Sequence, residues 1–323
     1  MRPGHPAVVC VVCADPQDQP PGLTARLGSD ATVRTVFGTA ELAEALPASD
    51  IAFVWDFRST GLREAWDEAS QVRWVHTASA GVDPFLFPGL RDRHVTLTNS
   101  RGVFDDAIAE FVLGAILAIA KDLPQTLRLQ RDHVWRHRQS QLVSGSAALV
   151  IGAGSVGRAV SRLLRAVGCQ VAGVARSERE DPSFDRVVRL SRLGDELAIA
   201  DFIIVTAPLT PQTAGLLGAD AFAAARQGAV LINVGRGPIV DERALLQALE
   251  SGRLRAAVLD VFGQEPLPSD HPFWDRADVV VSPHMCGDFR GFTGVLVDVF
   301  AANFSRWRSG QLLHNVIDLD RGY

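Results

Sequence analysis

The sequence predicts an α/β protein of two domains, each built on a parallel sheet. Short apolar segments typical of buried strands alternate with helical patterns along most of the 323 residues. Glycines gather between one such strand and the helix after it, in the segment Gly152–Gly157 near the middle of the chain. A chain of this length can form two separate hydrophobic cores. We therefore expect two domains, with the glycine-rich one inserted in the middle of the chain.

The first domain is predicted to comprise residues 1–102 and 285–323. Its strands are expected at Ala7–Val12, Ile51–Trp55, Val72–Thr77 and Val95–Thr98, with helices at Glu41–Leu46 and Leu62–Ser70. Alternating strands and helices indicate a parallel sheet, which needs cover on both faces. The final helix, expected at Gly294–Trp307, would return to supply that cover.

The second domain is predicted to comprise residues 103–284. Its strands are expected at Leu149–Ile151, Val171–Val174, Phe202–Thr206, Val230–Asn233, Ala257–Val261 and Val279–Val281, with helices at Leu193–Ile199, Ala219–Ala225 and Glu242–Ser251. A helix at Asp105–Lys121 is apolar nearly all round, as expected for one buried between domains or subunits. The basic segment Leu127–Arg138 is expected to be a solvated helix with one buried residue, Trp135.

The glycine-rich segment predicts a dinucleotide site. It follows a strand and opens a helix, and a second strand follows that helix. Gly152 would allow the sharp turn, Gly154 the close approach of a pyrophosphate and Gly157 the close packing of helix on strand. The amino end of the helix would hold the phosphates. This pattern is typical of Rossmann/flavodoxin-like sheets, although a glycine-rich turn in another kind of βα unit is the alternative.

The end of the next strand predicts the choice of nucleotide. An acidic residue there would bind the adenosine ribose 2′-OH of NAD, but this chain has Ala175, followed by Arg176 and Ser177. Arg176 could grip a 2′-phosphate, with Ser177 as a further donor. We therefore expect NADP(H) to be preferred, with NAD(H) still possible. The alternative is an exposed basic loop, in which Glu178 reduces the positive charge.

Three polar side chains follow the ends of predicted strands. They are Arg236, Glu265 and His284, and none of the three would be informative alone. Carboxyl ends of strands in a doubly wound sheet line the ligand crevice, so the three should converge beside the nicotinamide. The sequence therefore predicts a catalytic site made of these residues.

The motifs around these residues resemble the D-isomer-specific 2-hydroxyacid dehydrogenase family. The resemblance lies in Asn233–Gly237, Asp260–Pro266 and Ser282–His284, and in the order of the two domains. Pro208-Leu209-Thr210 with Thr213 resembles the family's cofactor-side loop, and Ala78–Asp83 resembles its substrate loop. Ala175-Arg176-Ser177 is similar to the NADPH-using glyoxylate/hydroxypyruvate reductase branch.

The resemblance implies an oxidoreductase that reduces a small 2-oxoacid to the D-2-hydroxyacid by hydride transfer from NADPH. Arg236 would hold the substrate carboxylate, His284 would donate a proton to the carbonyl oxygen, and Glu265 would orient the imidazole. The substrate loop would contribute Ser79 and the backbone N–H groups of Ala80 and Gly81. Asp260 would face the nicotinamide carboxamide. Further cofactor contacts are expected at Ser155, Val156, Ala207, Pro208, Thr213, Val234 and Gly235.

Other functions stay open at this stage. Phosphoglycerate, formate and phosphite dehydrogenases are alternatives within the resembling family. A nucleotide-binding scaffold or corepressor-like protein without turnover is the alternative from another class. The segment Met285–Asp288 departs from the commoner family pattern and could alter the preferred substrate, and Cys286 is expected to be a packing residue.

Composition limits the possible partners. The net charge is −5, which argues against nucleic acid, and no segment suits a signal peptide or a membrane span. Cys10 and Cys13 form a Cys-x-x-Cys that could be redox-active but is better explained as packing within a strand. We expect a cytoplasmic protein without a metal. We also expect a homodimer, because the apolar helix from Asp105 and the resembling family both favour one.

Overall fold

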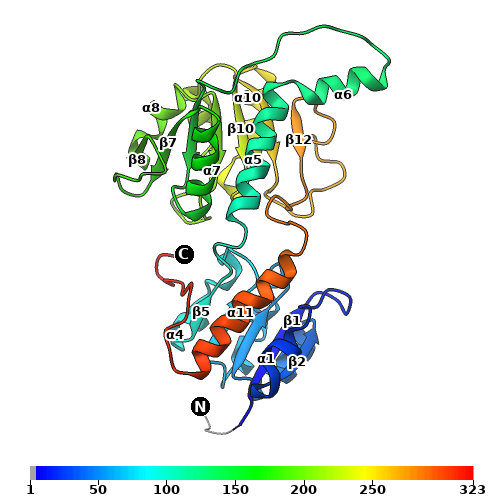
Figure 1. Ribbon diagram of the computed structural model, residues 1–323, viewed down its shortest axis with the longest axis vertical. Coiled ribbons are helices and arrows are strands. Elements are labelled where there is room, and N and C mark those ends of the chain that lie inside the picture. The colour runs from blue at the N-terminus through cyan, green and yellow to red at the C-terminus, as the bar shows by residue number, and fades with distance from the viewer. Residues whose placement is uncertain (1–4, 323) are drawn as a thin grey trace. The chain divides into compact units, whose positions relative to one another are not determined.

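The structure is a computed structural model that describes residues 5–322. The chain forms two compact units (Figure 1), the first drawn from Met1–Val103 and Phe289–Tyr323 and the second from Phe104–Asp288. The sequence placed these boundaries after residues 102 and 284. Each unit has its own parallel sheet, as predicted.

The first unit contains a five-stranded sheet within the described residues, in the order β2-β1-β3-β4-β5. Every neighbouring pair in it is parallel. This order, with the first strand between the second and third, is that of flavodoxin-like sheets. The strands are β1 (Ala7–Cys13), β2 (Ala31–Phe37), β3 (Ile51–Val54), β4 (Trp74–Thr77) and β5 (Thr96–Thr98), and the helices are α1 (Leu23–Leu27), α2 (Thr39–Ala45), α3 (Gly61–Glu64), α4 (Pro88–Asp92) and α11 (Phe292–Arg308).

Helix α11 returns to the first unit, which confirms the predicted role of the C-terminal helix. Its buried Phe300 stacks on Phe53 of β3 with ring centroids 4.2 Å apart, and on Trp74 of β4 at 5.1 Å. The three aromatic rings join the helix to two adjacent strands.

The second unit contains a seven-stranded sheet within the described residues, in the order β12-β11-β10-β9-β6-β7-β8. All of its strand pairs are parallel, and the order reverses between β6 and β9. Ligands of such sheets bind outside the carboxyl ends of the strands at this switch point. The strands are β6 (Ala147–Ile151), β7 (Gln170–Ala175), β8 (Arg186–Arg189), β9 (Phe202–Val205), β10 (Ala229–Asn233), β11 (Leu254–Leu259) and β12 (Val279–Val281), and the helices are α5 (Asp105–Ala120), α6 (Leu123–Arg131), α7 (Ser155–Ala166), α8 (Leu193–Leu197), α9 (Ala219–Ala224) and α10 (Glu242–Glu250).

The helix predicted over Leu127–Arg138 is wrong in its bounds and in its buried tryptophan. Helix α6 begins four residues earlier, with Pro124 in its first turn, and ends at Arg131. A residue with positive φ, His133, follows the helix, and the N–H of Val134 bonds back to the carbonyl of Leu129. Such a left-handed residue terminates a helix. Trp135 therefore lies in the irregular segment beyond it and is fully exposed.

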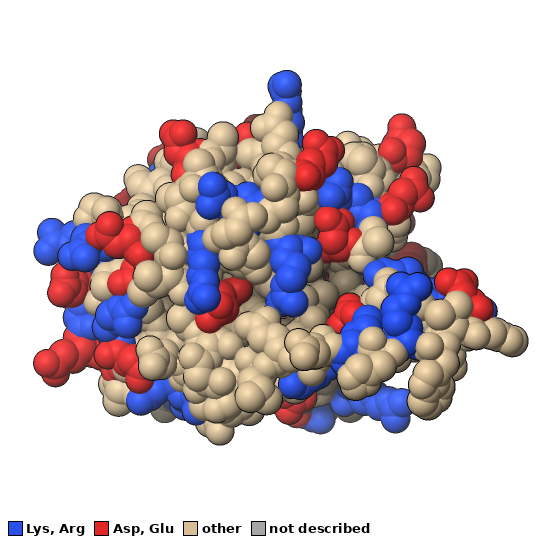
Figure 2. All heavy atoms as spheres, turned by 90° about the horizontal axis from the view of Figure 1, so that it is seen from above, with Lys and Arg blue, Asp and Glu red and all other residues tan. Residues whose placement is uncertain are grey.

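The surface carries charges of both signs. Figure 2 shows lysine and arginine interspersed with aspartate and glutamate on the face in view, without a broad area of one sign. Among residues 5–322, no helix combines the length and the hydropathy needed to cross a bilayer.

Candidate active site

The glycine turn follows β6 at the switch point of the second sheet. Gly152 has φ +112°, and a Cβ built on it would lie 2.6 Å from the amide nitrogen of Ala207, which follows β9. A Cβ on Gly157 would lie 2.0 Å from the carbonyl oxygen of Gly152, so only glycine allows α7 to start so close to the strand. A Cβ on Gly154 would meet no heavy atom within 4 Å. The turn therefore has one open backbone surface beside a helix amino end, which fits a pyrophosphate.

Arg236 is positioned by a tight turn after β10. Asn233, the last residue of that strand, is buried and uses both ends of its amide, accepting from the N–H of Gly235 and donating to the carbonyl of Arg236. Arg236 Nη1 donates to the carbonyl oxygen of Gly235 at 2.7 Å. A Cβ on Gly237 would lie 1.9 Å from the carbonyl carbon of Phe262, so glycine lets this turn pack against the segment after β11.

Glu265 and His284 form a hydrogen-bonded pair. Glu265 Oε2 lies 2.6 Å from His284 Nδ1, while Oε1 accepts the N–H of Phe262 at 2.9 Å. Burial alone would raise the pKa of the Glu265 carboxyl. The hydrogen bonds from His284 and Phe262, with the charges of His284 and Arg236, outweigh burial and lower that pKa. The carboxylate is thus ionised at neutral pH, and all three predicted catalytic residues interact within one unit.

Asp260 fixes the turn that carries His284. Its side chain is buried, and its two oxygens accept the backbone N–H groups of Met285 at 2.9 Å and Cys286 at 3.1 Å. Its backbone carbonyl accepts the N–H of His284, whose φ is +54°. Left-handed backbone in a residue other than glycine persists where the surroundings impose it. From the sequence, Asp260 was expected to face the nicotinamide, and that role stays a prediction. Its role in holding the backbone of the His284 turn was not predicted.

Cys286 lies in the core of the second unit and is 8% exposed. Burial, and then the neighbouring Asp260 carboxylate, raise the pKa of its thiol far above the ordinary value. A neutral, buried thiol is a poor nucleophile. These properties suit the packing role that the sequence predicts.

The other predicted cofactor residues line the same ends of the sheet. Thr213 Oγ1 donates to the carbonyl of Pro208 and accepts the N–H of Thr210, which folds the loop after β9. Ser155 Oγ donates to the Asp105 carboxylate at 3.3 Å. Among the remaining predicted cofactor residues, Ala207, Val234 and Gly235 are buried and Val156 is half-buried. Arg176 and Ser177 are exposed. Their contacts with a cofactor stay predictions.

The predicted substrate loop lies in the first unit, after β4. Ser79 Oγ donates to the carbonyl of Gly81 at 2.6 Å, and Asn99 Nδ2 donates to the carbonyl of Ala80 at 2.5 Å. With both carbonyls held, the backbone N–H groups of Ala80 and Gly81 have no acceptor among residues 5–322. Two adjacent unpaired amides are suited to an anion.

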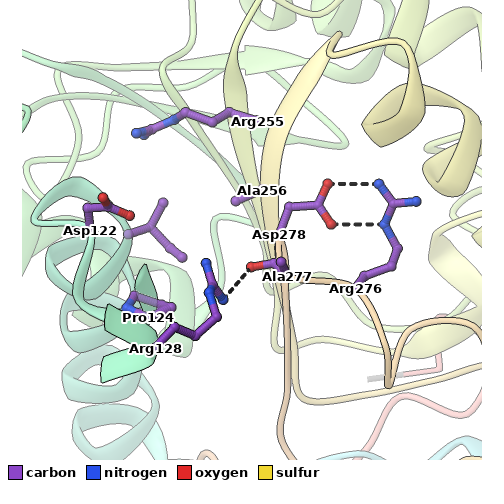
Figure 3. Close-up of a pocket in the computed structure, with 9 residues that line it drawn as sticks. Asp122, Pro124, Arg128, Arg255, Ala256, Arg276, Ala277 and Asp278 are labelled. Atoms are coloured by element: carbon purple, nitrogen blue, oxygen red, sulfur yellow. Dashed lines mark hydrogen bonds and ion pairs between the residues drawn. The ribbon is translucent and has the colours of Figure 1, made fainter. Parts of the chain in front are cut away.

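A cavity of about 560 Å³ lies elsewhere, at the amino ends of β11 and β12 (Figure 3). Its charged groups are largely matched: Arg276 forms two hydrogen bonds to Asp278, and Arg128 donates to the carbonyl of Ala277. None of the predicted catalytic or cofactor residues lines it. Within residues 5–322, no cluster of three or more histidine, cysteine or acidic side chains is arranged to hold a metal.

Comparisons with known proteins show the family to which the chain belongs. The sequence profile described as D-isomer specific 2-hydroxyacid dehydrogenase, NAD binding domain, matches residues 113–286. Glyoxylate/hydroxypyruvate reductase A of Serratia proteamaculans is 32% identical over 285 residues, covering 85% of this chain and 88% of the relative. The chain belongs to the D-isomer specific 2-hydroxyacid dehydrogenase family. Its second unit accordingly contains the family's nicotinamide-dinucleotide-binding domain.

Solved structures of the family have the same fold. A family member from Xanthobacter autotrophicus Py2, in complex with NADPH and MES, is 30% identical with a TM-score of 0.85, covering 99% of this chain and 100% of that chain. An NADPH-dependent glyoxylate/hydroxypyruvate reductase from Sinorhizobium meliloti, in complex with NADP and sulfate, is 29% identical with a TM-score of 0.87, covering 98% and 100%.

Some relatives in the family are longer. The D-3-phosphoglycerate dehydrogenase of Mycobacterium tuberculosis is 33% identical over 269 residues, which is 82% of this chain. The chain therefore spans about half the length of this relative, since the match covers 51% of it.

Proposed function

We propose that the protein reduces a small 2-oxoacid of the glyoxylate or hydroxypyruvate kind to the D-2-hydroxyacid, with NADPH as hydride donor. The main support is the 2.6 Å contact between Glu265 and His284. The positive charge of Arg236 helps to lower the pKa of the same Glu265 carboxyl. These groups follow three adjacent strands of the sheet that carries the glycine turn. Relatives named as glyoxylate/hydroxypyruvate reductases support the substrate class.

Each side chain has a distinct task in the proposed reaction. The bound reduced nicotinamide supplies the hydride. The guanidinium of Arg236 holds the substrate carboxylate, because its planar donors match two oxygens. His284 Nδ1 is held by Glu265, so Nε2 would donate the proton to the carbonyl oxygen. The ionised Glu265 stabilises the imidazolium that gives the proton and fixes its orientation.

The preference for NADP(H) is supported by the residues after β7. That strand ends at Ala175, and the exposed Arg176 and Ser177 follow. The end of this strand carries no carboxylate that could repel a 2′-phosphate. The NADPH and NADP bound in the two structural neighbours support the same choice.

The direct test is loss of absorbance at 340 nm with NADPH and, separately, NADH, against glyoxylate, hydroxypyruvate and phenylpyruvate. We expect turnover with at least one 2-oxoacid and a lower KM for NADPH than for NADH. Tight NADPH binding without turnover on any 2-oxoacid would favour the scaffold instead. A clear preference for NADH would overturn the cofactor choice.

We also propose that the protein is a homodimer, which joins through α6 and the segment that follows it. Large apolar side chains are exposed there at Leu123, Leu127, Val134, Trp135 and Leu142, and Leu117 is exposed on the preceding helix, α5. An apolar surface of this kind is typical of a protein interface. A second copy of the chain would cover this surface, in keeping with the dimer that the apolar helix predicts. A cytoplasmic location remains a prediction.

A further inference from the structure

Arg179 ties the segment after β7 to the glycine turn. Its guanidinium Nη2 donates a hydrogen bond to the carbonyl oxygen of Ala153 at 2.6 Å. Its backbone forms an antiparallel bridge with Val187 in β8. Ala153 lies between Gly152 and Gly154, so this one residue connects the edge of the sheet to the predicted phosphate site.

Asp181 holds Arg179 and Arg158 together. Its side chain is only 4% exposed, and its Oδ2 lies 2.8 Å from Arg158 Nε and 3.8 Å from Arg179 Nη2. Burial alone would raise the pKa of this carboxyl, but hydrogen bonds from Arg158 and the Ser183 amide, with the two positive charges, lower it instead. Asp181 is therefore a buried, ionised bridge between α7 and the segment after β7.

Helix α7 holds the same segment at two further points. Ser161 Oγ donates to the carbonyl of Ser183 at 2.6 Å, and Arg165 Nη1 donates to the carbonyl of Pro182 at 2.7 Å. Arg158, Ser161 and Arg165 are spaced three and four residues apart, so they share one face of the helix. A segment fixed at so many points loses little conformational freedom when a ligand binds, which favours affinity.

The charges near the segment favour an anion. Arg158 and Arg179 face one carboxylate, Asp181, so these three groups carry one positive charge in excess, which the exposed Glu180 opposes from the surface. Glu178 is exposed and lies 3.8 Å from Arg189 of β8, so its negative charge has a partner. Glu178 therefore opposes a bound phosphate less than the sequence alone indicates.

We propose that Arg179 is a positioning residue for cofactor choice. Its bridge between Ala153 and Asp181 holds the segment after β7 in the conformation that presents Arg176 and Ser177 to the 2′-phosphate of the adenosine ribose. The inference rests on the proposed preference for NADP(H). It adds that the preference depends on how the segment is held as well as on the side chains that meet the phosphate.

The test uses two fragments of the cofactor and needs no turnover. Dissociation constants of 2′,5′-ADP and 5′-AMP are measured by titration calorimetry on the full chain. Arg179→Gln is expected to weaken 2′,5′-ADP about tenfold and 5′-AMP by less than about twofold. Arg179→Lys should bind 2′,5′-ADP with an affinity between those of the wild type and Arg179→Gln, since one ammonium cannot reproduce the planar donors of the guanidinium. The matched control is Arg192→Gln, which removes the same charge from an exposed pair with Asp195 and should change neither constant.

Two further variants separate positioning from simple charge attraction. Asp181→Asn removes a negative charge, so charge attraction alone would tighten 2′,5′-ADP binding, whereas loss of the bridge would weaken it. Ser161→Ala removes a tether without changing charge and should also weaken it. The positioning role would be contradicted if Asp181→Asn bound 2′,5′-ADP as tightly as the wild type or more tightly. It would also be contradicted if neither Ser161→Ala nor Arg179→Gln weakened 2′,5′-ADP binding. Thermal unfolding of each variant verifies that it is folded.

Arg176→Ala separates this inference from the proposed function. A wild-type protein that binds 2′,5′-ADP no better than 5′-AMP would contradict the NADP(H) preference itself. Wild-type selectivity that Arg176→Ala abolishes and Arg179→Gln leaves intact would contradict only the positioning role.

Discussion

At the scale of single residues, the position of His284 depends on the buried carboxylate of Asp260. That carboxylate accepts two consecutive backbone N–H groups in the turn that follows the histidine. Removing it leaves the buried amide of Cys286 without a partner, at a cost of about 1–3 kcal/mol, and also frees the partly buried amide of Met285. Loss of the Asp260 carboxylate should therefore both displace His284, the proposed proton donor, and destabilise the second unit.

We predict that Asp260→Ala lowers kcat by about tenfold or more and lowers the thermal unfolding temperature, because the His284 turn loses both acceptors. Asp260→Asn keeps one acceptor oxygen and should retain more of both. Steady-state kinetics and calorimetry measure the two effects. A raised KM for NADPH with wild-type kcat and stability would mean that Asp260 acts only on the cofactor.

A second prediction concerns His76, a buried histidine in the first unit that takes no part in the proposed chemistry. Its Nδ1 lies 2.7 Å from Thr98 Oγ1, and burial lowers the pKa of the imidazole from 6.5 to about 3. In the unfolded chain the same group gains a proton near pH 6.5. The stability that the neutral His76 retains above pH 6.5 is therefore lost as the pH falls toward 3, by about 1.4 kcal/mol per pH unit.

Urea denaturation from pH 6.5 to 4 checks this prediction. His76→Gln should reduce the slope of unfolding free energy against pH by one proton, whatever it does to the absolute stability. His5→Gln, which changes an exposed histidine in the same unit, is the matched control. An unchanged slope in His76→Gln would contradict the assigned burial.

At the scale of elements, the glycine turn divides into structural and ligand-facing positions. Gly157→Ala should destabilise the fold, because its Cβ would collide with the Gly152 carbonyl. Gly154→Ala should leave thermal stability unchanged, because φ is −87° and its Cβ meets open space. It should still weaken NADP binding about tenfold or more by obstructing the approach of the pyrophosphate.

Thermal unfolding and titration calorimetry with NADP measure both variants. Wild-type affinity in Gly154→Ala would show that the pyrophosphate does not approach this face of the turn. Full stability in Gly157→Ala would contradict the close packing of α7 on the turn after β6.

The sequence was most informative where strands are buried on both faces. The central strands of both sheets read as continuous apolar segments and were predicted, as was the parallel arrangement. Two edge strands were missed, β2 and β8, because their exposed residues interrupt the apolar pattern: β2 reads ATVRTVF and β8 reads RVVR. Helix α6 was misplaced because its end depends on the left-handed His133, which no periodicity reveals.

Within the site, residue types were predictable and their supports were not. Arg236, Glu265 and His284 stand out because each follows an apolar strand. Asn233 and Asp260 also end strands or follow them, and that position was the available signal for a positioning role. The bridge through Arg179 and Asp181 had no signal in the sequence, since it joins segments whose contact depends on how residues 176–183 fold back on α7.

At the scale of the whole molecule, the proposed dimer gives a prediction about mass. Light scattering should give twice the chain mass of 34.8 kDa for the wild type. Trp135→Ser combined with Leu142→Ser should shift the protein toward the monomer, because both side chains are strongly exposed on the segment after α6. Leu312→Ser, an equally exposed leucine in the other unit, is the matched control. A monomeric wild type would contradict the interface.

In the proposed reaction, an imidazole held by a carboxylate gives the proton to a 2-oxoacid. The most direct measurement is kcat of His284→Ala with the best 2-oxoacid substrate and saturating NADPH, beside the affinity for NADPH by calorimetry. His314→Ala, an exposed histidine away from the proposed dimer surface, is the control and should behave as the wild type. We predict a fall in kcat of about a hundredfold or more in His284→Ala with little change in NADPH affinity. Near-normal turnover in that variant would contradict the role of His284 as the proton donor.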